Sequence, residues 1–568
     1  MEERHESHEG RPQRWALPAL IGTGLVSALL YLFAWRPMAY RFALDTPPDQ
    51  HPIVGFLALW FIAFALYFVG IRFASRVKRR AAALAVIAVF GAAFRLTMWQ
   101  TPPILEDDIY RYLWDGYVTA HGQNPFRFAP VEVAQFAAWD GVDIPSARLP
   151  RDQVCRMPRE EIGRLLGADG LTEEDRARLA RLQELTRRER FALNNLTTLW
   201  DTERYGEALL AINHPHIPTI YPPFAQVVFA AASWVKPMDM MAVKGLVILF
   251  DILTGVLIAV LLRMLGRNPC LCVIYAWSPL VIKEFANTGH CDAIAVCCVV
   301  GALVLVLRGR RVMTGAALAL GFLTKMFPMV LIPIAWRRMG RRGVIAFAIL
   351  VVLFYLPFAG LGIGEMFQGL GAYAERWEFN SGLFTLFEKN VAERLLPPPH
   401  GAIDPFLATK LATGAVFLAL LAWLVRREDD GDIALARRMF IVLGALLLLG
   451  PTANAWYFCW IAPFLCVFPR RSWLLLTCLV GLVYLYHVPP SAAADGWVWN
   501  TLIRPVVVHI PFGPRGDAAL WQALPDPARN EQLHEWWRTF GVRLAEYVPF
   551  YALLIGEAVA VRRRRNDE

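Results

Sequence analysis

Three consecutive carboxylates open the motif EDDIYRYLWDG, residues 106–116, directly after an apolar stretch. Adjacent acidic groups at a membrane face are costly unless they are solvated or used in a reaction. The same motif carries Arg111 and Trp114. Aromatic rings beside carboxylates often hold sugars, because ring faces stack on C–H groups and carboxylates accept protons from hydroxyls. A solvated loop is the alternative interpretation, and the acidic motif alone does not decide between the two.

A second group of ionisable residues falls between two apolar stretches, in KEFANTGHCD, residues 283–292. It contains Glu284, His290 and Asp292, and a histidine beside two carboxylates is less often structural than a lone histidine. Three adjacent residues such as those at 290–292 rarely converge on one ion, so no metal site is predicted there. A divalent cation, Mg²⁺ or Mn²⁺, stays an open alternative, because carboxylates serve either as bases or as ligands.

A lysine lies in the middle of an apolar stretch, in LTKMFP, residues 323–328. An ammonium group at such a position requires an anionic partner. A salt bridge within the protein is one interpretation of Lys325. The other is a phosphate at the outer leaflet, since an ammonium is a compact phosphate-binding charge.

Two further motifs bring aromatic side chains. IYPPFAQ, residues 220–226, contains Tyr221, and PTANAWY, residues 451–457, contains Trp456 and Tyr457. Both have structural alternatives: paired prolines suit the first turn of a helix, and Trp and Tyr are common at membrane interfaces.

The elements that must position these motifs are membrane helices. Hydrophobic residues make up 56% of the chain, charged residues only 18%, and the mean hydropathy is +0.40. A helix needs ~20 apolar residues to cross ~30 Å of hydrocarbon. Apolar blocks of about this length recur at 15–35, 52–71, 81–98, 245–262, 290–307, 343–360, 404–425 and 546–562.

The net charge of +9 reflects Lys and Arg at the ends of these blocks, as at 76–80, 337–342 and 562–565. Such placement is typical of cytoplasmic loops and not of a nucleic-acid groove. It predicts that both termini are cytoplasmic. Eight of the nine cysteines lie in or beside apolar blocks, and Cys155 lies alone in a polar loop. No disulfide framework is therefore indicated.

Threading the chain with basic junctions inside predicts about 14 membrane segments. Two are hairpins broken within 312–336, near Lys325, and within 437–468, at Gly450-Pro451, and 221–244 is expected to be re-entrant or interfacial. The predicted external loops are 99–220, 361–403 and 489–545. The chain thus divides into an N-terminal tail and hairpin (1–80), a core (81–470) and a C-terminal region (471–568).

A polar insert at 150–200 interrupts the first long external loop. Thr172 to Asp175 is typical of a helix N-cap, and Leu179, Leu182 and Leu185 recur at helical spacing. We expect a short amphipathic helix on the membrane surface.

Taken in order, these motifs resemble the GT-C superfamily of membrane glycosyltransferases. They look most like the polyprenyl-phosphate-sugar-dependent branch that includes glycosyltransferase family 87 and related bacterial mannosyltransferases. The resemblance covers roughly residues 80–470 and is carried by EDDIYRYLWDG (106–116), NPF (124–126), IYPPFAQ (220–226), GHCD (289–292) and LTKMFP (323–328). It departs from the family at the hairpin 15–71, since the family's acidic loop commonly follows the first span.

The resemblance implies an all-α, GT-C-like bundle and an inverting enzyme. The enzyme would move a sugar from a polyprenyl-phosphate donor to a hydroxyl of a glycan or glycolipid acceptor. The family resemblance favours mannose as that sugar. Its site would lie on the external, periplasmic face of an inner or plasma membrane. The family's general base corresponds to Asp108, with Asp107 as the competitor. Lys325 is the expected ligand of the donor phosphate, and Arg111 is less favoured.

The remaining motif residues are expected to contact the sugar or the acceptor: Glu106, Tyr110, Trp114, Tyr221, Glu284, His290, Asp292, Trp456 and Tyr457. A transporter or flippase of a lipid-linked sugar is the main alternative, and it should show internal repeats and polar midplane residues. An ion-coupled carrier that uses Lys325 and Asp251 is a third. The sequence shows no clear repeat, and its charges gather at the outer interface.

Overall fold

The computed structural model describes most of the chain, namely residues 14–145, 147–361, 363–395, 404–427, 431–488, 501 and 535–567. Within these ranges the chain is almost entirely helical, and the single sheet is a two-stranded hairpin. The chain divides into two compact units. Unit 1 comprises Met1–Glu106, Val247–Val351 and Trp377–Glu568, and unit 2 comprises Asp107–Leu246 and Val352–Arg376.

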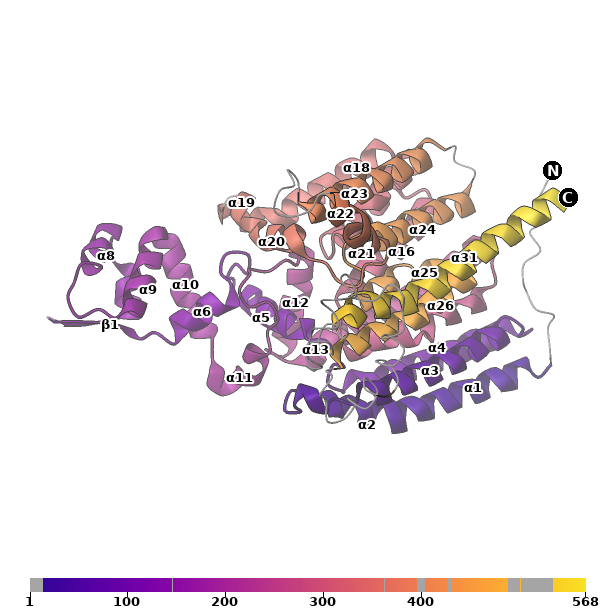
Figure 1. The fold of residues 1–568 in the computed structure, drawn as a ribbon, viewed down its shortest axis with the longest axis horizontal. Helices are drawn as coiled ribbons and strands as arrows, with labels where there is room; N and C mark the ends of the chain where they lie inside the picture. Colours follow the sequence, from indigo (N-terminus) through magenta and orange to yellow (C-terminus); the bar gives the residue numbers. More distant parts are fainter. Residues whose placement is uncertain are drawn as a thin grey trace, which may run out of the picture. The chain divides into compact units, whose positions relative to one another are not determined.

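Unit 1 begins with three helices, α1 (Ala16–Leu30), α3 (Ile53–Ala74) and α4 (Arg80–Trp99), which lie side by side in Figure 1. Their apolar side chains favour burial or lipid, and the helix pairs every backbone group internally. The further helices of unit 1 are α14 (Val273–Ala276), α15 (Pro279–Val281), α16 (Asp292–Leu307), α17 (Arg311–Phe322), α21 (Leu383–Phe387), α22 (Glu393–Leu395), α23 (Pro405–Arg426), α24 (Asp432–Leu449), α25 (Ala462–Val467), α26 (Arg471–Leu479) and α31 (Val542–Asp567). Two helices have residues in both units, α13 (Met240–Met264) and α18 (Ile332–Tyr355).

Seven helices in the described ranges are long and apolar enough to cross a bilayer. The number rises to eight if Pro269–Ala276 and Pro279–Asn287, which are bent by 49°, form one span. These helices support the predicted all-α membrane protein, but not the predicted 14 segments. The count was too high because several apolar stretches form helices of only 10–17 residues, shorter than the ~20 that a crossing needs. These short helices are Pro223–Val235, Asp292–Leu307, Arg311–Phe322 and Arg471–His487.

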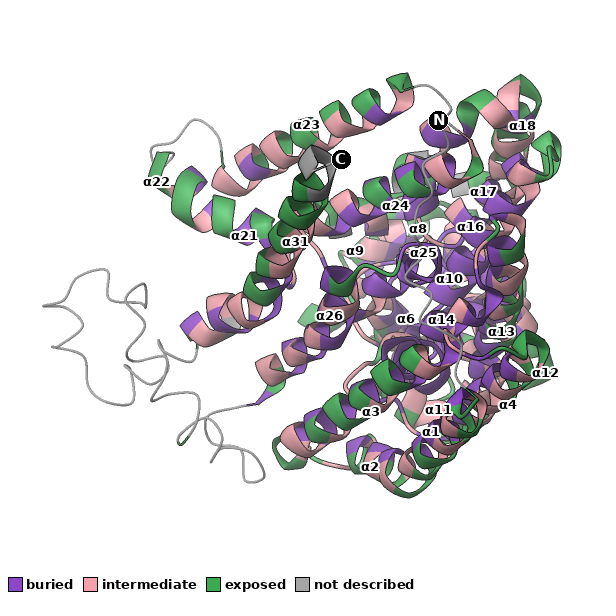
Figure 2. Ribbon diagram, turned by 90° about the vertical axis from the view of Figure 1, so that its right-hand side faces the viewer, coloured by how far each residue is buried: buried purple, intermediate pink, exposed green. Residues whose placement is uncertain are grey.

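Some apolar faces of unit 1 stay exposed. The most apolar stretch of Phe327–Gly360 has a mean hydropathy of 2.4, yet only 6% of it is buried. Figure 2 shows the same contrast in colour, since α25 is buried whereas α23 is mostly intermediate or exposed. A large apolar surface in water marks an interaction site or a liability. Lipid acyl chains are the natural cover for these helices.

Both predicted helix breaks in unit 1 are confirmed. α17 ends at Phe322, and the next helical turn starts only at Phe327, beyond Lys325. α24 ends at Leu449, directly before Gly450-Pro451, and a 3-10 turn follows over Ala455–Trp460. Proline lacks the N–H that a continuing helix would use, so the chain turns at both of these points.

The acidic residue within an apolar helix, Asp251 on α13, has a partner in unit 1. Arg95 of α4 donates from Nε to Oδ2 at 2.5 Å and from Nη2 to Oδ1 at 3.1 Å. Its Nη1 donates to the carbonyls of Gly91 and Ala276, at 2.9 and 2.7 Å. A buried pair with two parallel hydrogen bonds has the geometry of a structural ion pair. This arrangement argues against a carrier that uses Asp251.

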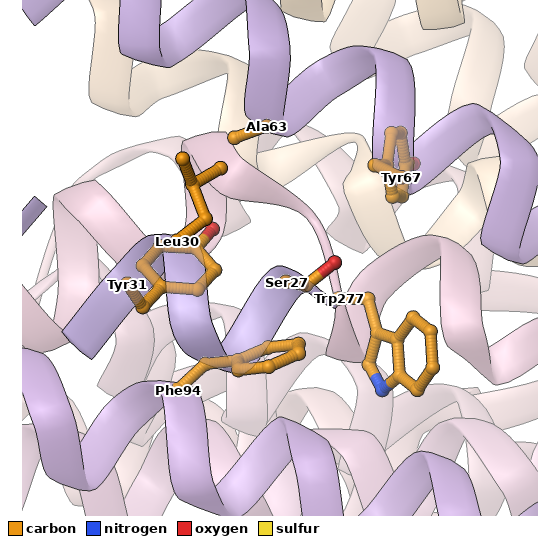
Figure 3. A pocket seen from close by; sticks show the side chains of 7 residues that line it. All are labelled: Ser27, Leu30, Tyr31, Ala63, Tyr67, Phe94 and Trp277. Atoms are coloured by element: carbon orange, nitrogen blue, oxygen red, sulfur yellow. The ribbon is translucent and has the colours of Figure 1, made fainter. Parts of the chain in front are cut away.

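A narrow pocket lies among the N-terminal helices of unit 1 (Figure 3). Its lining is Ser27, Leu30, Tyr31, Ala63, Tyr67, Phe94 and Trp277. The walls are mostly apolar and aromatic, and the Tyr67 hydroxyl is used in a hydrogen bond to the Ile274 carbonyl at 2.8 Å. The pocket is therefore a packing feature of these helices and not a candidate site.

Unit 2 is organised around α5 (Asp108–Ala120) and α12 (Pro223–Val235). Tyr112 of α5 stacks on Phe229 of α12 with ring centroids 4.5 Å apart, and Gly116 has no side chain to obstruct the close approach of the α12 backbone. The other elements of unit 2 are α6 (Pro130–Ala137), β1 (Gly141–Ile144), β2 (Ala147–Pro150), α7 (Arg151–Arg156), α8 (Arg159–Leu165), α9 (Glu173–Glu184), α10 (Arg187–Leu199), α11 (Thr202–Leu210), α19 (Ile363–Met366) and α20 (Gln368–Arg376). The strands β1 and β2 are antiparallel.

The predicted helix of the polar insert is present as α9, which Thr172 caps through its side chain. Leu179 and Leu182 are fully buried, as their spacing predicts. The helix is not isolated, because Arg190 of α10 donates to the carbonyls of Leu185 and Met157 at 2.7 and 2.8 Å. The insert is thus a small helical assembly, and its place on the membrane surface stays a prediction.

Thr186→Ala is expected to loosen the start of α10. Thr186 and Glu189 form a capping box, in which each side chain accepts from the other residue's backbone N–H. Loss of such a cap costs about 1 kcal/mol. In hydrogen-exchange mass spectrometry of the full-length protein, amides in the first turn of α10 should exchange about fivefold faster. Thr198→Ala, whose hydroxyl donates only to a carbonyl within α10, is the control, and equal exchange in both variants would refute the role of the cap.

Candidate functional site

The acidic motif places two carboxylates at the N-terminus of α5 in unit 2. Asp107 is the N-cap residue, and Asp108 is the first residue of the helix. Unpaired N–H groups at a helix start favour negative charge nearby. Asp107 is exposed and Asp108 is half-buried, so the two carboxylates have different surroundings.

Asp108 is held by three neighbouring side chains. Asn213 Nδ2 donates to its Oδ1 at 2.5 Å. The hydroxyls of Tyr221 and Tyr112 donate to its Oδ2 at 3.0 and 3.3 Å. Asn213 Nδ2 also donates to Oδ1 of Asp107 at 3.0 Å. The amide therefore bridges both carboxylates, whereas the two tyrosines fix the orientation of Asp108.

Two neutral groups accompany these carboxylates. Burial lowers the pKa of His214, and Arg111 lowers it further against the opposing effect of Asp108. Burial, with added repulsion from Asp107 and Glu207, raises the pKa of Tyr110 to about 12. At neutral pH His214 is therefore an uncharged imidazole and Tyr110 a protonated phenol.

A second polar network lies in the interior of unit 2. Arg111 Nε donates to Asp115 Oδ1 at 2.9 Å, and its Nη1 donates to the carbonyl of Ile217 at 3.1 Å. The other Asp115 oxygen accepts from the Thr219 hydroxyl and from Gln226 Nε2, the latter at 3.4 Å. Both charged side chains are buried. Arg111, the less favoured phosphate ligand, is thus engaged by Asp115.

The predicted sugar-binding aromatic residues of the acidic motif lie inside unit 2. Trp114 is buried and meets Trp200 edge-on, with ring centroids 4.9 Å apart. Tyr110 is buried as well. Tyr221, by contrast, reaches Asp108 with its hydroxyl. Of these aromatic residues, Tyr221 is the one that the structure brings to the carboxylate pair.

In unit 1, the motif KEFANTGHCD folds as a π-helical turn, Ile282–Asn287, then turns at Gly289 with φ of 76° and enters α16 at Asp292. π-helical turns are rare and frequently occur at functional sites. The ionisable residues of this motif are all fully buried: Lys283, Glu284, His290 and Asp292.

Lys283 is surrounded by acceptors within unit 1. Its Nζ lies 3.2 Å from the carboxylate of Glu284 and 3.5 Å from that of Glu106, and it donates to the Tyr484 hydroxyl. The Tyr484 oxygen lies 2.8 Å from Glu284 Oε1 and 3.1 Å from Glu106 Oε1. Glu106, a predicted substrate ligand, is therefore anchored here, apart from the two carboxylates that follow it in the sequence.

The same cluster contains the strongest candidate for a metal site in the described part of the chain. Ligand atoms of Glu106, Glu284 and His290 lie within 4.8 Å of one another, as a divalent cation would require. The ammonium of Lys283 already pairs with both carboxylates and would repel a second cation placed beside it. Mg²⁺ or Mn²⁺ would fit only with Lys283 displaced or deprotonated.

Three predicted motifs meet in unit 1. The ring of His290 stacks on Trp456, with centroids 4.1 Å apart and planes 14° from parallel. Trp460 Nε1 donates to Oδ1 of Asp292 at 2.7 Å. Oδ2 of Asp292 lies 3.2 Å from Nζ of Lys325. KEFANTGHCD, LTKMFP and PTANAWY are therefore neighbours in space.

Aromatic rings also lie near Lys325. The rings of Phe327 and Tyr457 stack on Trp460, at 4.1 and 4.3 Å between centroids. Nζ of Lys325 lies 5.6 Å from the Tyr457 ring centre, and its side chain is 15% exposed. The salt-bridge interpretation of Lys325 thus has its partner in Asp292. The phosphate interpretation stays a prediction.

Sequence reasoning assigned no role to Asn213, Tyr484 or Trp460. Trp460 lies within the predicted hairpin 437–468 and Tyr484 within an apolar stretch, where aromatic residues are ordinarily packing or interface residues. Asn213 stands directly before His214, and this run of hydrogen-bonding side chains was the available signal.

Comparisons with known proteins point to one family. Residues 219–452, about two fifths of the chain, match the model of glycosyltransferase family 87. No curated protein and no solved structure matches the chain. The matched segment contains Tyr221, the motif at 283–292 and Lys325, and it begins after the acidic motif. The match of residues 219–452 to glycosyltransferase family 87 supports a glycosyltransferase activity in general and is consistent with a GT-C-like membrane enzyme.

Proposed function

We propose that this protein transfers a sugar from a polyprenyl-phosphate donor to a hydroxyl of a glycan or glycolipid acceptor. Asp108 is the general base, and the sugar inverts its anomeric configuration in a single displacement. The observation that carries this proposal is the carboxylate of Asp108, oriented by Asn213, Tyr112 and Tyr221 at the start of α5. The family match supports the reaction class in general.

Asp108 suits the role of base better than Asp107. A catalytic base must be positioned within hydrogen-bonding reach of the proton that it takes. Three hydrogen bonds fix the orientation of Asp108, which is half-buried, whereas Asp107 is exposed and accepts from the same Asn213 amide. These donors and the helix start favour a carboxylate at this position.

The proposed step balances without any redox partner. The acceptor hydroxyl gives its proton to Asp108 as its oxygen attacks the anomeric carbon. The bond from that carbon to the phosphate oxygen breaks, and the electron pair leaves on the lipid phosphate. Charge therefore grows on the phosphate during the step, and a cation placed there stabilises the transition state.

Lys325 is our proposed cation for the leaving phosphate. Its ammonium pairs with Asp292, whose other oxygen is held by the Trp460 indole. A paired ammonium stays protonated in an apolar setting, and part of its side chain remains exposed to meet a second anion. Arg111 is the weaker candidate, because Asp115 already holds it.

Sugar recognition is assigned to side chains near these groups. Tyr221 touches Asp108. In unit 1 the half-buried Trp456 is the ring proposed to stack on a pyranose, while the buried rings of His290 and Tyr457 pack against it and hold it in place. We propose mannose as the sugar. Glu106 and Glu284 act through their ion pair with Lys283, as supports of the site.

We also propose that the reaction occurs on the external face of an inner or plasma membrane, with both termini in the cytoplasm. The basic junctions support this orientation, since positive residues flank cytoplasmic ends of membrane helices. A test of the whole proposal uses the purified protein in nanodiscs with radiolabelled polyprenyl-phosphate mannose and a glycolipid extract as acceptor. Labelled product together with free polyprenyl phosphate is the expected result. Movement of the intact donor across a vesicle membrane without any transfer would instead support a flippase.

Asn213→Ala is expected to lower the turnover number about 10- to 100-fold, because charge-assisted hydrogen bonds are worth about 1.5–3 kcal/mol. The variant leaves two adjacent carboxylates without their shared donor, so the pair should hold a proton more readily and the pH–rate profile should shift upward. Steady-state transfer assays between pH 5 and 9 (about the range that most enzymes tolerate) measure both effects. Asn195→Ala on α10 is the control, and an unchanged profile in Asn213→Ala would exclude a positioning role.

A further inference from the structure

A polar hollow in unit 2 is lined by residues that take no part in the proposed transfer reaction. Its volume is about 410 Å³, within the range of about 300–1,000 Å³ that small-molecule sites usually occupy. Its lining is Arg127, Arg181, Glu184, Leu185, Gly364 and Gln368. The insert helix α9 and the helices α19 and α20 therefore contribute to one concave surface.

Both guanidinium groups of the hollow are oriented by carboxylates. Arg181 donates from Nε to Glu132 at 2.7 Å and from Nη1 to Glu184 at 3.0 Å. Arg127 lies 2.8 Å from Glu189, and both of these side chains are mostly buried, with 12% and 18% exposed. The two guanidinium groups are thus held in place before any ligand arrives, which lowers the entropic cost of binding.

The charge of this group excludes a strongly anionic ligand. Three carboxylates, on Glu132, Glu184 and Glu189, surround two guanidinium groups, so the local net charge is negative. Phosphates and nucleotides would be repelled, although two arginines alone would favour them. A neutral ligand can use these groups without such repulsion.

The hydrogen-bonding groups suit hydroxyls. Arginine has five N–H donors, and the bonds to Glu132 and Glu184 use two of those on Arg181. The Glu184 side chain is 68% exposed and offers acceptor oxygens. The exposed amide of Gln368 both donates and accepts, and Gly364 leaves the space beside it open. Sugar hydroxyls both donate and accept, so they match a surface on which donors and acceptors alternate.

We infer that this hollow is a binding subsite for neutral sugar units of the acceptor, apart from the unit that receives the transferred sugar. The inference rests on the proposed function for the identity of its ligand as an acceptor. It assigns a role to the polar insert, which the transfer reaction itself does not use. A short neutral oligosaccharide is the class of ligand that the volume and the charge select.

The test measures binding of mannotriose, a neutral trisaccharide, to the full-length protein in nanodiscs without any donor. Saturation-transfer NMR and calorimetry should detect mannotriose, and acidic sialyllactose should bind more weakly. Arg181→Ala should weaken mannotriose about tenfold and Gln368→Ala should weaken it less, as expected for loss of charged and neutral hydrogen bonds. Arg178→Ala is the matched control on α9, because Arg178 pairs with Glu174 and does not line the hollow.

Several outcomes would overturn the inference: no binding of mannotriose to the wild type, equal binding in Arg181→Ala and Arg178→Ala, or tighter binding of sialyllactose. Gln368→Ala guards against misfolding, since its side chain is exposed and takes no part in the ion pairs of the hollow. The two proposals fail in different ways. If the proposed function is wrong, mannotriose should still bind but no sugar transfer should occur. If the subsite is wrong, transfer should occur but Arg181→Ala should not change mannotriose binding.

Discussion

Asp108→Asn is expected to reduce the rate of sugar transfer by about 100- to 10,000-fold, the usual contribution of a general base. Asparagine has the same size and can still accept hydrogen bonds from Tyr112 and Tyr221. It cannot take the proton of the acceptor hydroxyl. Folding should be unaffected, since the residue is only half-buried and asparagine has the shape of aspartate.

Asp107→Asn is the matched control, because it makes the same chemical change, carboxylate to amide, in the neighbouring residue. We expect a much smaller loss of rate from it, with transfer measured from polyprenyl-phosphate mannose in nanodiscs and folding checked by thermal unfolding. A larger loss in Asp107→Asn would assign the base to Asp107. Full activity in both variants would remove the catalytic role from the acidic motif altogether.

Lys325→Met is expected to weaken donor binding about 10- to 100-fold, because it removes one charge-assisted hydrogen bond to phosphate. It should also destabilise the protein, since Asp292 would keep its charge in a fully buried site without the ammonium at 3.2 Å. Removal of one partner of a buried ion pair costs about 3–5 kcal/mol. Donor affinity is read from binding of a labelled polyprenyl-phosphate sugar, and stability from thermal unfolding.

The double variant Lys325→Met/Asp292→Asn separates these two effects. It leaves no uncompensated charge, and asparagine can still accept from Trp460, so stability should largely return. Donor affinity should stay low. Recovery of both properties would mean that Lys325 serves only as the salt-bridge partner of Asp292. Lys236→Met, which breaks an exposed pair with Asp239, is the control for loss of a lysine and should change neither property.

The helices of the fold follow from the sequence where a long apolar block is uninterrupted. Ile53–Ala74 and Pro405–Arg426 lie within a few residues of their predicted ranges, because hydropathy and length alone determine such helices. The count of membrane segments failed where the chain bends. Near Pro279 the chain forms two short helices bent against each other, and the π-helical turn that follows accommodates buried polar residues such as Lys283. Hydropathy does not register these bends.

The candidate site was predictable as motifs and not as contacts. Lys325 requires an anion in any apolar setting, but nothing local in the sequence selects Asp292. Tyr484 and Glu106 are separated by 378 positions, and Trp460 and Asp292 by 168. Such pairs form only when distant helices pack, so a single sequence carries no pattern that reveals them.

This long-range pairing also changed the expected role of Glu106. Sequence reasoning placed it with Asp107 and Asp108 because the three are adjacent. In the structure its carboxylate meets Lys283 and Tyr484 instead. Glu106 is therefore a supporting residue, whereas its sequence neighbour Asp108 is the candidate base. This difference in role depends on tertiary packing.

The most direct test is an experimental structure of the protein with a polyprenyl-phosphate sugar bound. Our account predicts that Nζ of Lys325 contacts a phosphate oxygen and that the Asp108 carboxylate faces the anomeric carbon from the side opposite the phosphate. A phosphate bound away from Lys325, or an Asp108 carboxylate that opens to the other side of the membrane from the sugar, would contradict it.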